Sequence, residues 1–117
     1  MSKEVIDLAE VMERVQEDKE LLLELFDIFT ADYAVKKETL KTAITHKNYE
    51  VIKDVIHSIK GAAGNISAKT VHATCVNIEH LCVGKDIAAI QKVAVVLDGD
   101  FKVLQARMAE IKKEFLA

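Results

Sequence analysis

Residues 86–117, DIAAIQKVAVVLDGDFKVLQARMAEIKKEFLA, determine the fold class. Apolar side chains recur there at spacings that alternate strictly between three and four residues: Ile87, Ile90, Ala94, Leu97, Phe101, Leu104, Met108, Ile111 and Phe115. This spacing is typical of one apolar stripe along an α-helix, because each helical residue turns the chain by about 100°. The Asp98-Gly99-Asp100 stretch resembles a turn, but the apolar register passes through it unbroken. We therefore predict one continuous helix after the cap Asp86, about 43 Å long.

Four further helices are predicted upstream, each preceded by a side chain that can cap its first turn. They are expected to run from about Leu8 to Val15, from Asp18 to about Thr45, from Asn48 to near Ile66 and from Ser67 to near Gly84. Gly84 is expected to end its helix in a left-handed conformation. The predicted fold is all-α, an antiparallel up-down four-helix bundle with a short extra N-terminal helix.

Composition limits the classes of function. The 117 residues suit a single domain, and the absence of proline with only four glycines favours long helices joined by short connections. The net charge of −3 and the lack of a basic block argue against nucleic-acid binding. No apolar run approaches the roughly 18 residues of a membrane span, and residues 1–4 do not begin a signal peptide. We expect a cytoplasmic protein that does not enter a membrane.

His57 has the most informative surroundings in the chain. It lies in the stretch His57-Ser58-Ile59-Lys60-Gly61-Ala62-Ala63-Gly64 of the third predicted helix. Helical spacing gathers Lys53, Lys60, Gly61 and Gly64 around the imidazole and places the apolar residues on the opposite side. The imidazole is therefore expected to face solvent, with two cations beside it and bare backbone beyond it.

Two glycines on one helix face need an explanation, because each costs about 0.5–1 kcal/mol relative to alanine. Without Cβ atoms at Gly61 and Gly64, another protein could approach the helix backbone closely. Lys60 is placed to offset the charge of a phosphoryl group, and Lys53 is its weaker counterpart. Neutral imidazole is a competent nucleophile near pH 7. The pattern indicates that His57 is a phosphoacceptor on a docking surface.

The run from His57 to Ile66, followed by Cys75 and Ile78-Glu79, resembles the signature of histidine-containing phosphotransfer (HPt) domains. The resemblance implies that His57 takes a phosphoryl group from a receiver-domain aspartate and passes it to another receiver. It implies that the receivers supply Mg²⁺ and most of the catalysis, so this chain needs no cofactor and has no autonomous enzymatic activity. Receiver domains, and a hybrid sensor histidine kinase, are the expected partners of a monomer. Many family members carry glycine where this chain has Glu17 and Ser67.

Other interpretations of these residues remain open. An isolated helical histidine is usually an ordinary surface residue, and Gly61 and Gly64 could instead serve close helix packing. The main alternative is a helical adaptor that binds a receiver or kinase without being phosphorylated, and a purely structural bundle is a third. His72, Cys75 and Glu79 have metal-ligand chemistry, but Cys75 belongs to an apolar stripe and a fourth ligand is missing, so no metal site is expected.

Overall fold

The computed structural model describes residues 5–117, and the described secondary structure is entirely helical. The helices are α2 (Leu8–Arg14), α3 (Lys19–Thr45), α4 (Tyr49–Asn65), α5 (Lys69–Val83) and α6 (Ile87–Leu116). The predicted all-α fold is confirmed, and α6 passes through Gly99 without a break. The signal-peptide expectation concerns residues 1–4, which lie outside the described residues.

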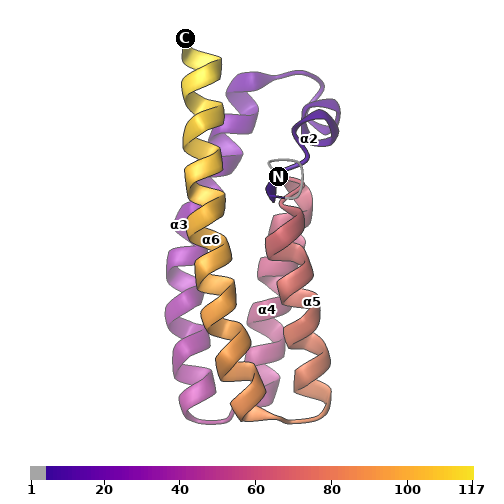
Figure 1. The fold of residues 1–117 in the computed structure, drawn as a ribbon, viewed down its shortest axis with the longest axis vertical. Helices are drawn as coiled ribbons and strands as arrows, with labels where there is room; N and C mark the ends of the chain where they lie inside the picture. The colour runs from indigo at the N-terminus through magenta and orange to yellow at the C-terminus, as the bar shows by residue number, and fades with distance from the viewer. Residues whose placement is uncertain (1–4) are drawn as a thin grey trace.

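The four long helices form an antiparallel bundle in which α3, α4, α5 and α6 follow one another around the axis (Figure 1). Each of them packs against its two neighbours in that order, so α4 and α5 form one side and α3 and α6 the other. The shorter α4 and α5 end below the outer ends of α3 and α6, and α2 lies above them. None of the helices described here combines the length and the apolar run that a membrane span requires.

A continuous apolar core fills the bundle axis, because each long helix turns its 3.6-residue stripe inward. In α4 the buried stripe is Ile52, Ile56, Ile59 and Ala63. On the other side of the core, the Tyr33 ring stacks on Phe101 with ring centroids 3.9 Å apart. The Tyr33 hydroxyl donates to Asp98 at 3.4 Å, so its polar end is satisfied at the edge of the core.

Side-chain caps begin four of the helices as predicted. Asp7, Asp18, Asn48 and Asp86 each accept a hydrogen bond from the backbone N–H three residues further along the chain. The predicted cap at Ser67 is wrong, because α5 starts after Ala68 and has no side-chain cap. Ser67 is instead buried, with a left-handed φ of 55°.

The expectation for Gly84 is also wrong. Gly84 has a right-handed φ of −82°, and the next residue, Lys85, takes the left-handed conformation with φ of 50°. The cause is a Schellman-type ending, in which the N–H of Lys85 bonds to the Cys82 carbonyl and that of Asp86 to the Leu81 carbonyl. This geometry requires positive φ one residue beyond the C-cap. Ser67 occupies the matching position after α4.

Candidate functional site

His57 lies in the middle of α4 on the side turned away from the core. Its neighbours Ile56 and Ile59 are buried, while 73% of the His57 side chain is exposed. This difference follows from the helical period, which separates consecutive residues by about 100° around the axis. The solvent-facing imidazole expected from the sequence is thus present in the structure.

Glu79 of α5 connects the imidazole to the nearest lysine. One carboxylate oxygen, Oε2, lies 3.3 Å from His57 Nδ1, and the other, Oε1, accepts a hydrogen bond from Lys60 Nζ at 2.8 Å. The Glu79 side chain is only 20% exposed, so it is largely covered where α5 packs against α4. A single carboxylate therefore holds two side chains of α4 in place.

The ionisation of Glu79 determines which imidazole nitrogen is free. The hydrogen bond from Lys60, and then that with His57, lower the pKa of the Glu79 carboxyl below its usual value, so it is ionised near pH 7. An ionised carboxylate can only accept hydrogen bonds, so Nδ1 must be the protonated nitrogen. In the neutral imidazole, Nε2 then carries the lone pair. Because the ring is so exposed, a partner can reach that nitrogen.

The two predicted lysines have different surroundings. Lys60 is half-buried and bonded to Glu79, one helical turn after His57. Lys53 is exposed one turn before His57 and makes no hydrogen bond or ion pair with the residues that the structure describes. Lys60 is therefore positioned by the fold, whereas Lys53 contributes only a solvated charge.

The two glycines also differ. A Cβ atom on Gly61 would meet nothing within 4 Å, so this position opens directly to solvent. A Cβ atom on Gly64 would lie 3.7 Å from the His72 ring of α5, which is an ordinary contact. Gly64 thus lies where α4 packs against α5, and its carbonyl accepts a hydrogen bond from Arg14 of α2 at 2.6 Å. Both positions could accommodate alanine without a clash.

The residues considered as metal ligands do not converge. Within residues 5–117, no group of three His, Cys, Asp or Glu side chains is arranged to hold a metal ion. Cys75 is buried and unpaired, and burial raises the pKa of its thiol to about 12. Glu79 is engaged by His57 and Lys60 instead.

Sequence reasoning missed the role of Glu79, although it singled out the Ile78-Glu79 pair. The sequence alone does not give the register between α4 and α5 that brings Glu79 to His57. His57 lies seven residues before Gly64, and Glu79 lies seven residues after His72, which contacts the Gly64 position. In two antiparallel helices, equal steps away from a contact reach the same height, so the contact between His72 and the Gly64 position places His57 and Glu79 opposite each other.

The network around Arg14 was also missed. Its guanidinium donates to the carbonyls of Gly64 and Asn65 at 2.6 and 3.0 Å, and so satisfies the C-terminal end of the histidine helix. Glu10 of α2 accepts hydrogen bonds from Ser67 and Lys69, each at 2.8 Å. These contacts connect residues fifty or more positions apart, and no local sequence pattern predicts them.

Comparisons with known proteins identify a family and a matching fold. The family model of the Hpt domain matches residues 24–114. A solved structure of a rice protein, assigned as a histidine-containing phosphotransfer protein, superposes with a TM-score of 0.83 at 19% sequence identity. That match covers 98% of this chain and 88% of the rice chain, and at this identity it establishes the fold alone. No curated protein matches the sequence.

The family match spans most of the chain, so the protein belongs to the Hpt domain family. Its role is accordingly histidine phosphotransfer in a phosphorelay. The family is one of phosphoryl carriers that act together with the other proteins of a relay.

Proposed function

We propose that His57 is the phosphoacceptor and that residues 1–117 act as one carrier domain between two receiver domains. The observation that supports this assignment best is the pairing of an exposed His57 ring with Glu79 at Nδ1. Nε2 is then the nucleophile, and it faces solvent where a receiver can reach it. His46, His72 and His80 have no carboxylate or lysine bonded to them among the described residues.

Transfer of the phosphoryl group to His57 needs no additional proton acceptor. The Nε2 lone pair attacks the phosphorus of the receiver's aspartyl phosphate and forms an N–P bond. The P–O bond breaks, and its electron pair remains on the receiver carboxylate. The imidazole ring becomes positive and keeps its Nδ1 proton, which the ionised Glu79 stabilises. In the reverse step the N–P electron pair returns to Nε2.

Lys60 is the cation nearest to the incoming phosphoryl group. Its ammonium group can turn from Glu79 towards the phosphoryl oxygens, since lysine carries three donors on a flexible stem. The open position at Gly61 leaves room for the receiver's surface against the backbone of α4. We propose that the receiver supplies the remaining catalytic groups and that a hybrid sensor kinase provides the first of these receivers. The proposed setting is the cytoplasm.

A phosphotransfer assay tests the assignment. The protein is mixed with several receivers phosphorylated by a small-molecule donor, and acid-labile, base-stable phosphate on the chain is measured. Wild type should become labelled and His57→Gln should not. His80→Gln should behave as wild type, because His80 is also exposed but has no carboxylate or lysine bonded to it among the described residues. Label that persists in His57→Gln would refute the site. Receiver binding without label on wild type would favour the adaptor.

A further inference from the structure

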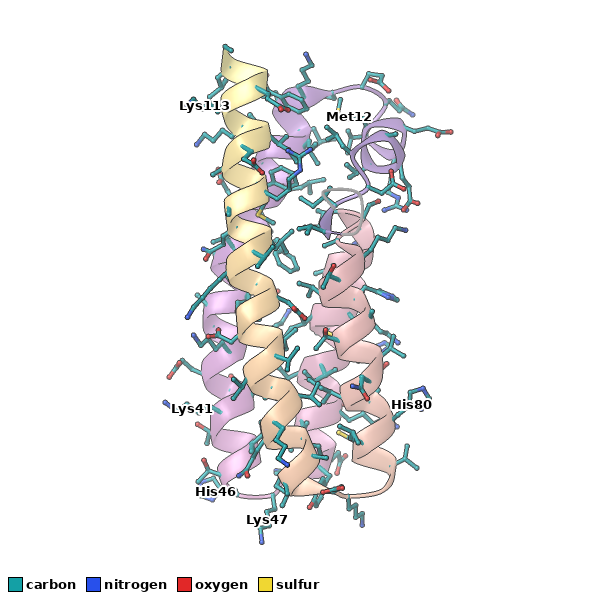
Figure 2. The ribbon with its side chains drawn as sticks, in the orientation of Figure 1. Met12, Lys41, His46, Lys47, His80 and Lys113 are labelled. Atoms are coloured by element: carbon teal, nitrogen blue, oxygen red, sulfur yellow. The ribbon has the colours of Figure 1, made fainter. Side chains whose placement is uncertain are left out.

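The face formed by α3 and α6 is the side of the bundle turned away from His57. Figure 1 shows α3 and α6 together on one side, with α4, α5 and α2 on the other. In Figure 2, Lys41 of α3 and Lys113 of α6 project on this side, while His80 of α5 projects on the opposite one. A partner bound to the α3–α6 face would therefore leave His57 accessible.

The surface formed by α3 and α6 is shallow and largely apolar. Two grooves of about 160 and 450 Å³ run along it, and both are lined by side chains of α3 and α6 only. Every seventh residue of α6 lies in one exposed row along the face, since seven residues are close to two helical turns: Ala88, Val95, Lys102, Ala109 and Leu116. Val95 is 73% exposed although it borders the larger groove.

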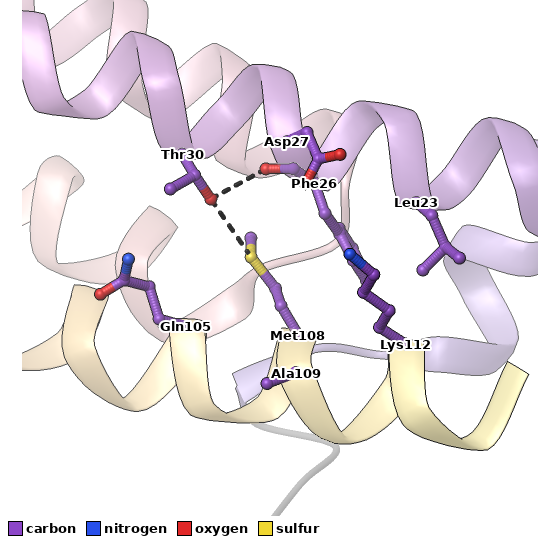
Figure 3. A pocket seen from close by; sticks show the side chains of 8 residues that line it. All are labelled: Leu23, Phe26, Asp27, Thr30, Gln105, Met108, Ala109 and Lys112. Atoms are coloured by element: carbon purple, nitrogen blue, oxygen red, sulfur yellow. Dashed lines mark hydrogen bonds between the residues drawn. The ribbon is translucent and has the colours of Figure 1, made fainter. Parts of the chain in front are cut away.

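Charge is distributed unequally between the two helices at the outer end of this face. Glu20 and Asp27 of α3 are exposed carboxylates, and Lys112 and Lys113 of α6 are exposed cations. None of the four forms an ion pair with the residues that the structure describes. Asp27 and Lys112 line the same groove (Figure 3). The acidic pair of α3 and the basic pair of α6 therefore lie at a similar level along the bundle axis.

We propose that two copies of the chain pair through their α3–α6 faces. A twofold axis parallel to the bundle places α3 of one copy against α6 of the other, and keeps every residue at its own height. Glu20 and Asp27 then lie opposite the partner's Lys112 and Lys113, and the same contacts occur twice. Val95 and the small residues of its row become covered. Self-complementary charge argues for a second copy as the occupant, and the monomer expected from the sequence is the competing outcome.

Sedimentation equilibrium from micromolar to millimolar concentration tests the pairing. Wild type should show a monomer–dimer equilibrium that weakens with added salt, because exposed ion pairs are screened. Val95→Glu should raise the dissociation constant by roughly tenfold or more, since it places a charge in the covered row. Val83→Glu is the matched control, because Val83 is also highly exposed, at 82%, but lies on α5. A wild type that stays monomeric throughout, or equal effects of both substitutions, would overturn the proposal.

Charge reversal gives a second measurement that does not depend on one substitution. The variant Glu20→Lys/Asp27→Lys and the variant Lys112→Glu/Lys113→Glu should each dimerise poorly, because like charges then meet twice. Mixed in equal amounts, they should pair again, since every contact in the mixed dimer is between opposite charges. Circular dichroism verifies that each variant is folded. Failure of the mixture to associate while wild type dimerises would reject this face, and larger species would indicate head-to-tail contact instead.

Discussion

Glu79 Oε2 lies 3.3 Å from His57 Nδ1, while Glu79 Oε1 accepts a hydrogen bond from Lys60 Nζ at 2.8 Å. Before transfer, the lysine ammonium is therefore bonded to a carboxylate of α5 rather than exposed to solvent. A phosphoryl group on Nε2 would compete with Glu79 for that ammonium. The same carboxylate thus orients the proposed nucleophile and keeps Lys60 close to it.

Glu79 should make the free energy of unfolding depend on pH in the acid range. Its pKa is lowered in the folded state, so its contribution is present above the usual value of 4.5 and is lost as the pH falls through the folded pKa. We expect Glu79→Gln to lower the free energy of unfolding by about 1 kcal/mol or less near neutral pH. The difference from wild type should shrink as the pH falls from about 5 through the lowered pKa of the folded state. Urea denaturation across this range measures it, and a constant difference would contradict the prediction.

Lys60 and Lys53 form a matched pair for testing charge support at His57. Lys60→Met should slow transfer by roughly tenfold or more, because a cation held beside the phosphoryl group is removed. Lys53→Met should have a much smaller effect, since the Lys53 side chain is solvated and unpaired among the described residues. Single-turnover transfer rates from a saturating phosphorylated receiver measure both. Equal losses would show that only the general charge of the face matters.

Gly61 and Gly99 are both exposed helical glycines with open space at the Cβ position. Alanine at either site should raise the free energy of unfolding by about 0.5–1 kcal/mol, because the unfolded chain loses freedom. Leucine should separate the two positions. Gly61→Leu should weaken receiver binding and slow transfer, whereas Gly99→Leu on α6 should leave both unchanged. Thermal unfolding and transfer rates, measured on the same samples, provide the comparison.

Gly64 lies beside His72 of α5, so a substitution there can distinguish a role in helix packing from a role in receiver docking. Gly64→Leu should leave the helical content intact, since the Cβ position is in ordinary contact at 3.7 Å and the longer side chain can turn towards solvent. The same substitution should slow transfer by adding bulk to the α4–α5 surface that a receiver would contact. A loss of thermal stability without a transfer defect would assign Gly64 to helix packing instead.

The left-handed turn residues predict a stability gain at one site and none at another. Lys85→Gly should stabilise the protein by about 1 kcal/mol, because glycine removes the cost of a left-handed residue with a Cβ. Ser67→Gly should give no such gain, since it deletes hydrogen bonds from Ser67 to Glu10 and from Arg14 to Ser67. Chemical denaturation of the two variants distinguishes these outcomes. An equal gain at both sites would show that the Ser67 contacts contribute little.

The fold was predictable because the helical pattern is local and repeated. The strict apolar spacing of α6 outweighed the turn-like Asp98-Gly99-Asp100 stretch. The capping residues Asp18 and Asn48 are recognisable by residue type, and each accepts a hydrogen bond from the backbone N–H three residues later. The predictions at Ser67 and Gly84 failed for one reason. Residue preference suggests that a turn is present, but the Schellman hydrogen bonds determine which residue takes the left-handed conformation.

The candidate site was predictable only in part. The facing of His57 towards solvent follows from the buried stripe of its own helix. The contact with Glu79 depends on the register between α4 and α5, which the short turn between them sets. The contact of Arg14 with Gly64 depends on how α2 packs on the bundle. Neither of these two contacts produces a periodic pattern in the sequence from which it could be predicted.

The high exposure of the His57 ring has a consequence for signal lifetime. A phosphoramidate formed at Nε2 would have no lid and no enclosing wall among the described residues, so bulk water would reach it as readily as a receiver would. The lifetime of the phosphorylated state would then depend on the intrinsic hydrolysis rate of the N–P bond and on the supply of receivers, and not on protection by the carrier's own residues.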